Sequence, residues 1–157
     1  MSTKRSAGIL LYREHLGVLE VLLAHPGGPY YDRKPDTGIW SIPKGEPKET
    51  ETDLEAVARR EFAEETGFTV KGTLLSLGFI IQKGGKEVFA WAARGQLDPS
   101  LTKSNLFTLE WPPRSGHIGY YPEIDKVAWC DPAEARVKVR AAQLPFLERL
   151  EAVLKKS

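Results

Sequence analysis

The sequence is poor in cysteine, in net charge and in long apolar segments, and each shortage narrows the class of protein. Its single cysteine, Cys130, excludes an internal disulfide and suits a reducing cytosol. The 22 Lys and Arg nearly balance the 21 Asp and Glu, and this formal net charge of +1 argues against general electrostatic binding to nucleic acid. The apolar run near the N-terminus meets polar residues too soon for a signal peptide or a membrane span. We therefore expect a cytoplasmic protein with no membrane partner.

Metal-binding histidine pairs and internal repeats are also missing. His15 and His25 have no ligand spacing to another histidine, which argues against a histidine-based zinc site. No repeat, low-complexity tract or linker divides the chain, and its 157 residues suit one domain with one core. We predict a single domain over residues 1–157.

Residues 53–66 have the pattern of a helix whose inner face changes from apolar to acidic. Thr52 is placed to serve as N-cap, with Glu55 three residues later to close a capping box, and Gly67 supplies a left-handed stop. The predicted core-facing stripe comprises Leu54, Val57, Ala58, Glu61, Phe62 and Glu65. Glu64 lies beside the acidic end of that stripe.

Three glutamates near the end of one helix are locally unfavourable. Like charges three or four residues apart repel by roughly 0.2–0.5 kcal/mol per pair, and the helix dipole disfavours anions in the last turn. Arg60, four residues before Glu64, can offset one of the three charges. A divalent ion such as Mg²⁺ or Mn²⁺ prefers hard oxygen ligands and would turn the repulsion into attraction. The alternative is a solvated acidic helix end, which is common for a lone E-x-x-E-E pattern.

The residues around this helix resemble the Nudix box, G-x5-E-x7-R-E-U-x-E-E-x-G-U, in which U is aliphatic or aromatic. Residues 60–68, REFAEETGF, match it at every fixed position, and Gly45 and Glu51 keep the five-residue gap. Eight residues rather than seven separate Glu51 from Arg60, which leaves the role of Glu51 open. The segments GIWSIPKGE, WPPRSG and YPEIDKVAW extend the resemblance to a bacterial subgroup of pyrophosphohydrolases, and SAGILLYR to diadenosine tetraphosphate hydrolases.

The resemblance implies an α/β fold, the α/β/α sandwich around a mixed β-sheet, and a hydrolase that needs Mg²⁺ or Mn²⁺. The implied metal ligands are the Gly45 carbonyl and the carboxylates of Glu61, Glu64, Glu65 and, from outside the box, Glu123. Neither Glu123 nor Asp125 follows from spacing alone, and a turn carboxylate before a strand is the alternative for both. Arg60 would orient Glu61 and Glu64, one of which would take a proton from water.

Two loops with tyrosine pairs, residues 25–38 and 114–123, are candidate nucleotide-binding loops. The predicted substrate-binding residues are Tyr30, Tyr31, Lys44, Arg114 and Tyr121. Aromatic rings stack on any base, so the leading substrate is diadenosine tetraphosphate or a related dinucleoside polyphosphate. Nucleoside triphosphates, including oxidised ones, come next, then nucleotide sugars and capped RNA ends. A solvated loop is the alternative for each loop, a non-catalytic nucleotide sensor is the alternative function, and a homodimer is left open.

The remaining pattern predicts the other elements of the sheet and one further helix. Strands are expected at residues 6–12, 19–24, 38–43, 73–82, 87–93, 105–111 and 126–130. The strands at residues 73–82 and 87–93 flank a K-G-G-K turn and form a hairpin, in which Phe79, Phe89 and Trp91 are expected in the core. Residues 141–155 are expected to form a helix that packs on the sheet, with a Glu151–Lys155 pair on its exposed side.

Overall fold

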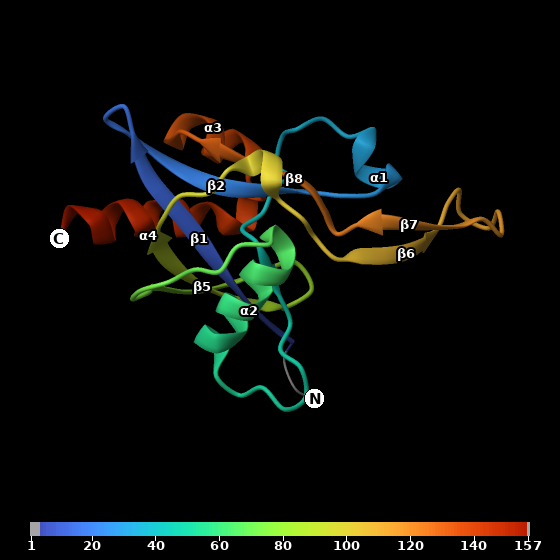
Figure 1. Cartoon of the computed structure of the whole chain (residues 1–157), viewed down its shortest axis with the longest axis horizontal. Coiled ribbons are helices and arrows are strands. Elements are labelled where there is room, and N and C mark those ends of the chain that lie inside the picture. Colours follow the sequence, from blue (N-terminus) through green and yellow to red (C-terminus); the bar gives the residue numbers. More distant parts are fainter. Residues whose placement is uncertain (1–3, 157) are drawn as a thin grey trace.

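A computed structural model describes residues 4–156 and shows one mixed sheet with helices on both faces (Figure 1). The sheet has the order β4–β5–β1–β2–β8, with β3 paired to one end of β1. Its strands are β1 (Arg5–His15), β2 (Val18–Pro26), β3 (Lys44–Gly45), β4 (Leu75–Ile81), β5 (Glu87–Arg94) and β8 (Ile124–Cys130). Strands β1 and β5 are parallel and the other pairs are antiparallel. The predicted α/β/α sandwich around a mixed sheet is confirmed.

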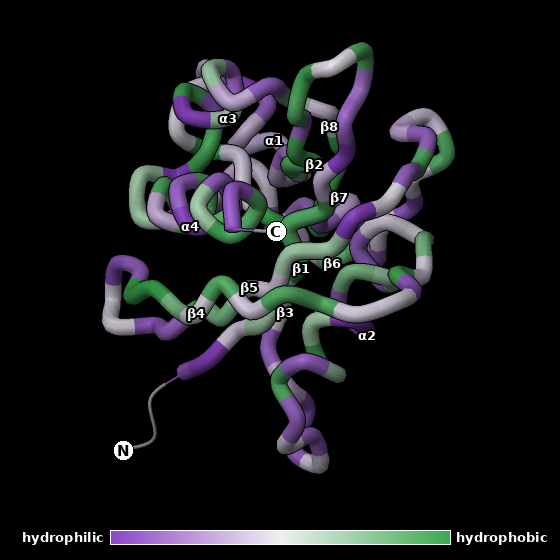
Figure 2. Tube along the Cα trace, turned by 90° about the vertical axis from the view of Figure 1, so that its left-hand side faces the viewer, coloured by the Kyte–Doolittle hydropathy of each residue, from purple (hydrophilic) through white to green (hydrophobic). Residues whose placement is uncertain are grey.

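The helices divide between the two faces because strand side chains alternate. Ile9 and Leu11 of β1 pack toward helix α2 (Leu54–Thr66), whereas Leu10 and Tyr12 pack toward α3 (Pro132–Lys138) and α4 (Leu144–Lys155). The middle of β1 is therefore buried on both faces. Figure 2 shows hydrophobic residues along the middle of the sheet and hydrophilic ones in the outer loops. In the described part of the chain, no helix is long and apolar enough to cross a membrane.

A two-stranded arm projects from this body, as Figure 1 shows. Strands β6 (Leu106–Glu110) and β7 (Ile118–Pro122) pair antiparallel, with Thr108 opposite Tyr120. The interpretation of residues 114–123 as a loop is therefore wrong for β7, whose glycine and proline obscure the alternation of its side chains. Neighbouring residues of a strand face opposite ways, so the arm separates Tyr120 from Tyr121.

Several local predictions were also wrong. Residues 38–43 make only isolated bridges, Trp40 to Val139 and Ser41 to Ala24, because the segment crosses from one partner to another. Phe79, expected in the core, is 45% exposed on β4, which lies at the edge of the sheet. In place of the Glu151–Lys155 pair, Glu151 accepts a hydrogen bond from Arg136 of α3 at 3.0 Å.

Two short helices and one 3-10 turn were not predicted. Helix α3 begins at a capping box formed by Asp131 and Glu134. It packs against α4 but is a separate helix. The single helical turn α1 (Pro29–Asp32) interrupts the otherwise irregular segment after β2. The 3-10 turns η1 (Pro99–Leu101) and η2 (Ala141–Gln143) complete the described elements, and η2 accounts for the first residues of the predicted C-terminal helix.

Candidate active site

Helix α2 carries the acidic residues, and its ends are set by local hydrogen bonds. Asp53, not Thr52, is the N-cap: its carboxylate accepts hydrogen bonds from the amides of Glu55 and Ala56, at 3.0 and 3.5 Å. The prediction for Thr52 is therefore wrong by one residue, since a carboxylate next to it reaches the same donors. Gly67 ends the helix with φ of 82°, as predicted.

The acidic end of α2 turns toward the protein rather than into bulk solvent. Val57, Ala58 and Phe62 of the stripe are buried against the sheet. Glu65, on the same stripe, is only 7% exposed, and the side chain of Glu61 is 12% exposed. The predicted inward-facing carboxylates are thus present at the residues the helical period indicated.

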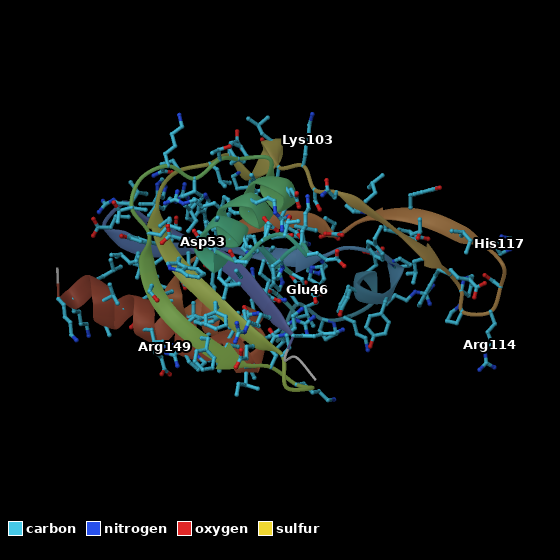
Figure 3. All side chains as sticks on the ribbon, turned by 90° about the horizontal axis from the view of Figure 1, so that it is seen from below. Glu46, Asp53, Lys103, Arg114, His117 and Arg149 are labelled. Carbon is cyan, nitrogen blue, oxygen red and sulfur yellow. The ribbon has the colours of Figure 1, made fainter. Side chains whose placement is uncertain are left out.

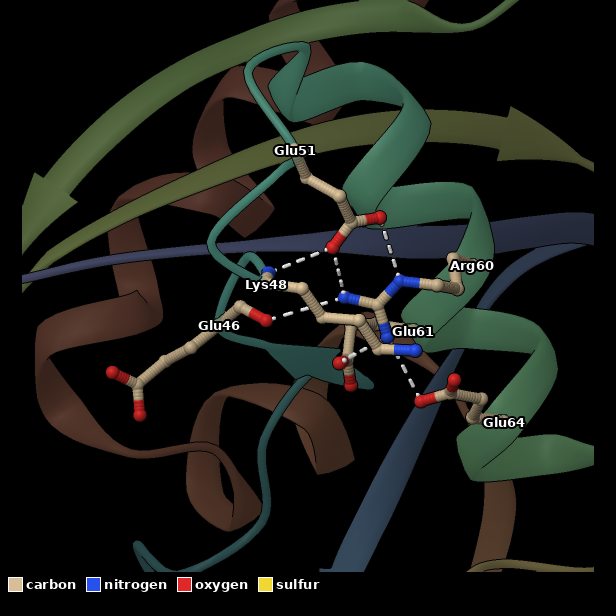
Figure 4. A network of polar contacts seen from close by, with 6 residues as sticks. All are labelled: Glu46, Lys48, Glu51, Arg60, Glu61 and Glu64. Carbon is tan, nitrogen blue, oxygen red and sulfur yellow. Dashed lines mark hydrogen bonds and ion pairs between the residues drawn. The ribbon is translucent and has the colours of Figure 1, made fainter.

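Arg60 holds three carboxylates in one network, which Figure 4 shows from close by. Its guanidinium donates to both oxygens of Glu51, at 2.6 and 2.8 Å, and to Glu61 and Glu64 at 2.8 and 3.0 Å. A further bond reaches the Glu46 carbonyl at 3.2 Å. We call Arg60 with Glu51, Glu61 and Glu64 the Arg60 cluster.

Charge pairing in the Arg60 cluster shifts the ionisation of its members. The hydrogen bonds that Arg60 donates lower the pKa of Glu51 to about 2, and the carboxylates that accept them raise the pKa of Arg60. Burial outweighs Arg60 at Glu61 and raises the pKa of that carboxyl. The extra residue between Glu51 and Arg60 is absorbed in the loop, so Glu51 pairs with Arg60 in spite of the longer spacing.

Gly45 lies directly against the Glu61 carboxylate. Strand β3 pairs with β1 through Gly45 and Ala7, which brings the glycine turn beside α2. A Cβ atom at this position would overlap the carboxylate of Glu61. Only glycine lets the backbone and that carboxylate approach so closely, and this approach is what a shared metal ligand set requires.

Glu123 joins the site from the short turn between β7 and β8. Its backbone is tied on both sides, because its N–H donates to the Asn105 carbonyl and its carbonyl accepts from the Gly27 amide. Its side chain shares a hydrogen bond with Glu65. Burial first, and then this hydrogen bond and the Glu123 charge, raise the pKa of Glu65 to about 8.

A cavity of about 300 Å³ opens beside Glu65 and Glu123. Its lining comprises Ala24, Pro26, Ile39, Ser41, Ile42, Lys44, Glu65, Gln82, Glu123, Ile124 and Arg140. Burial, together with the nearby charges of Lys86 and Arg140, lowers the pKa of Lys44 to about 8. The cavity therefore combines aliphatic walls with carboxylates and cations.

A buried glutamine organises the polar wall of the cavity. Gln143 is fully buried; its carboxamide oxygen accepts from the Ile42 amide and its nitrogen donates to Ser41 Oγ and Gln82 Oε1, each at 3.0 Å. These bonds hold the segment before Lys44 against η2 and against the end of β4. A polar group this deep needs such partners, because an unpaired one costs roughly 1–3 kcal/mol.

The tyrosines and Arg114 are distributed unevenly around this cavity. The Tyr31 hydroxyl accepts a hydrogen bond from Arg140 at 3.2 Å. Tyr30 is 51% exposed and meets Tyr31 edge-on at 5.0 Å. Tyr121 packs on Phe107, with ring centroids 6.1 Å apart. Arg114 lies at the far tip of the arm, as Figure 3 shows, so the structure does not bring it to the acidic residues.

Sequence reasoning missed Arg140, Gln143 and Gln82. Arg140 is the last of three basic residues at alternate positions, 136, 138 and 140, and nothing local distinguishes it from the other two. Gln143 precedes an amphipathic helix, where a polar residue is ordinary. Tertiary contacts, such as the bridge between Trp40 and Val139, place the segment around Arg140 beside the residues before Lys44.

The carboxylates fit a hard divalent cation in their chemistry, although they are held by other partners here. Over residues 4–156, no three acidic, histidine or cysteine side chains converge as a ready-made metal cage. Arg60 instead neutralises Glu61 and Glu64, and Glu65 and Glu123 share a hydrogen bond. Oxygen donors beside a glycine that leaves room for backbone approach suit Mg²⁺ or Mn²⁺, and burial raises the pKa of two of them, Glu61 and Glu65.

Comparison with known proteins identifies one family. Residues 2–150 match the model of the NUDIX domain. An 8-oxo-(d)GTP phosphatase of Mycolicibacterium smegmatis is 33% identical, over an alignment that covers 80% of this chain and 40% of that protein. The chain therefore spans less than half the length of this curated relative.

Solved structures match over nearly the whole chain. A binary complex of the C. elegans Ap4A hydrolase has a TM-score of 0.66 at 24% identity, over 99% of this chain and 100% of that one. The NUDIX domain of Shewanella oneidensis NrtR, solved with ADP ribose, has a TM-score of 0.69 at 17% identity, over 98% of this chain and 90% of that one. At these identities the likeness shows the shared fold.

Proposed function

Because this chain belongs to the NUDIX family, we propose that it is a divalent-metal-dependent hydrolase that cleaves a phosphoanhydride bond of a nucleoside polyphosphate. One observation carries the proposal: half-buried Glu61 lies against Gly45, and buried Glu65 lines a cavity together with Glu123 and Lys44. A structural acidic helix end would have its carboxylates in solvent. The carboxylates of Glu61 and Glu65 are instead turned inward, where a cation and a phosphate chain would stabilise them.

The implied metal would be held by the Gly45 carbonyl and by carboxylates of the box and of the β7–β8 turn. The proposed ligands are Gly45, Glu61, Glu64, Glu65 and Glu123. When bound, Mg²⁺ or Mn²⁺ neutralises charge on the phosphate oxygens and acidifies water. The support for this assignment is the donor set, which consists only of oxygens.

The residues of the chain would divide the remaining tasks. Arg60 orients Glu61 and Glu64 through the bonds described above. Glu61 is the proposed acceptor of the water proton, because burial moves its pKa upward toward the working pH. Lys44, in the cavity wall, would bind a phosphate oxygen of the substrate. The aliphatic walls would exclude bulk water around the cleaved bond.

We propose a nucleoside triphosphate, including an oxidised one, as the substrate class. The cavity of about 300 Å³ is at the small end of ligand sites and suits one nucleotide. The tyrosines do not supply two base clamps, because Tyr30 and Tyr31 contact each other and Tyr121 lies against Phe107. The named activity of the mycobacterial relative, on 8-oxo-(d)GTP, agrees with this choice.

A dinucleoside polyphosphate is the second candidate. Two observations favour it: the full-length fold match to the Ap4A hydrolase, and Tyr30, which is exposed near the cavity-lining residues and available to a second base. A non-catalytic nucleotide sensor is less well supported, because all the box glutamates are retained.

The test is a screen for hydrolysis in Mg²⁺ or Mn²⁺, with the products identified by mass. The substrates are dGTP, 8-oxo-dGTP, diadenosine tetraphosphate and ADP-ribose, with Glu65→Gln as the inactive control. Turnover of the triphosphates above the others supports the proposal. Preferred turnover of diadenosine tetraphosphate selects the second candidate, and tight binding without turnover identifies a sensor.

A further inference from the structure

Two cations in the cavity wall, Lys44 and Arg140, belong to no ion pair of the described residues, unlike several arginines of the chain. The ion pairs of the described residues include Arg5, Arg13, Arg59, Arg60 and Arg136. Over the same residues, no ion pair includes Lys44 or Arg140. The partly buried guanidinium of Arg140 has one side-chain partner, the uncharged hydroxyl of Tyr31.

Without a ligand, this arrangement of Lys44 and Arg140 costs electrostatic free energy. Arg140 and Lys44 line the same cavity of about 300 Å³, where their like charges repel. A guanidinium has five N–H donors in a planar fork that matches phosphate. One bond to a phenol leaves most of that capacity unused. An anion between the two cations would remove both the repulsion and the unused donors.

The fold holds Arg140 in this position. Its amide donates to the Trp40 carbonyl at 2.9 Å, and its carbonyl accepts from the Gln143 amide at 2.8 Å. The Tyr31 hydroxyl accepts a hydrogen bond from the guanidinium at 3.2 Å and so orients it. Because the backbone and side chain are both held, the residue is organised before a ligand arrives, which lowers the entropy cost of binding.

We propose that Arg140, with Lys44, binds a phosphate group of the substrate beyond those held at the carboxylates, and so selects chains of three or more phosphates. The inference rests on the proposed function, since it assigns the length of the phosphate chain that the same site accepts. Tyr31 is a positioning residue, acting through Arg140 rather than stacking on a base.

The first experiment measures binding directly, so that it does not depend on turnover. Inorganic phosphate, pyrophosphate and triphosphate are titrated calorimetrically into the protein with Ca²⁺, and into Arg140→Gln, Arg140→Lys and Arg136→Gln. We expect affinity to rise with chain length, and Arg140→Gln to weaken triphosphate binding about 10–100-fold, the range for lost charge-assisted bonds. Arg140→Lys, which keeps the charge without the fork, should lose less.

Arg136→Gln is the matched control, because Arg136 lies four residues before Arg140 in the sequence but pairs with Glu151 outside the cavity. Its triphosphate affinity should stay within about twofold of the wild type, as for an exposed ion pair. Equal losses in Arg136→Gln and Arg140→Gln would mean a non-specific charge effect, and the inference would be wrong. Phosphate and triphosphate binding with equal affinity would also overturn it.

Kinetics then separate this inference from the proposed function. Relative to the wild type, Arg140→Gln should raise KM for a nucleoside triphosphate about 10–100-fold and leave KM for the matching diphosphate within about threefold. Tyr31→Phe should raise KM for the triphosphate about threefold at unchanged kcat. If the wild type hydrolyses triphosphates but Arg140→Gln keeps the same KM, the inference fails and the proposed function stands. If no substrate is hydrolysed but triphosphate binding needs Arg140, the reverse holds.

Discussion

The Arg60 cluster and the cavity beside it are both rich in charge, yet they differ in how that charge is satisfied. In the cluster, one guanidinium bonds three carboxylates and a carbonyl, so each charge has a partner within the fold. In the cavity wall, Lys44 and Arg140 belong to no ion pair of the described residues, and burial and Glu123 raise the pKa of Glu65 to about 8. The first arrangement is complete as it stands, and the second becomes complete only with cations and an anion bound.

This difference predicts how the stability of each region responds to substitution, although Glu61 and Glu64 of the cluster are also proposed metal ligands. A partner removed from the cluster leaves unpaired charges and should reduce stability. A charge removed from the cavity relieves strain and should reduce activity while the fold persists. The following substitutions test that division, beginning with the largest expected effect.

Glu65→Gln should reduce turnover by more than about 100-fold, since even residues that merely support metal ligands contribute about 10–100-fold. The unfolding midpoint in EDTA at pH 8 should be unchanged or higher, because a buried carboxyl that resists ionisation is replaced by a neutral amide. Steady-state kinetics and thermal unfolding measure the two effects. Wild-type turnover in this variant would remove Glu65 from the metal site.

Arg60→Met should destabilise the fold by about 2 kcal/mol, less than the roughly 3–5 kcal/mol for a fully buried pair because the Arg60 side chain is partly exposed. Urea unfolding measures the loss, and Arg136→Met, which breaks an exposed pair, is the control at about 0.5 kcal/mol or less. Equal losses in the two variants would show that the cluster is no more than a surface network.

The stability of the metal-free protein should fall as the pH rises from 5 to 9. The folded-state pKa of Glu65, about 8, lies above its ordinary 4.5, so the proton stabilises the fold below pH 4.5 and this contribution is lost as the pH approaches 8. We expect a loss on the order of 2 kcal/mol in EDTA, measured by urea unfolding at each pH. The slope should flatten in Glu65→Gln, and Mg²⁺ should restore stability at pH 8; an unchanged slope in the variant would assign the pH dependence to other groups.

Tyr30→Ala should have the smallest effect, a rise in KM below about threefold at constant kcat. A full base stack contributes about 1–3 kcal/mol, or roughly 5–150-fold, but Tyr30 is exposed and already contacts Tyr31 and Lys34. Kinetics on a nucleoside triphosphate and on diadenosine tetraphosphate provide the measurement. A large rise for the dinucleotide alone would favour the second candidate substrate.

Local patterns predicted the central elements well. Helix α2 and its stop at Gly67, the β1–β2 and β4–β5 hairpins and strand β8 lie close to their expected positions. Their signals are periodicity and turn residues within a short window. The arm was missed because β7 reads as a glycine-rich loop until it is paired with β6, and the cap at Asp53 was missed because two neighbouring residues offer the same chemistry.

The candidate site divides in the same way. The order of residues along one helix was enough to place Glu61 and Glu65 on an inward stripe, because helical geometry depends only on spacing. It left open whether Glu51 could still reach Arg60 across a longer loop, and the hydrogen bonds of Arg60 answer that question. Residue order along the chain also did not indicate that Arg140 shares a cavity with Lys44.

By itself, then, the sequence determined the family, the sandwich and the acidic face of one helix, since these follow from short-range spacing and a dense motif. Only the tertiary structure decided which distant groups meet at the candidate site: Glu123 beside Glu65, and Arg140 in the cavity wall with its hydrogen bond to Tyr31. The physical reason is that burial and charge pairing depend on distances in space. Those distances are set when the sheet brings together segments that lie far apart along the chain.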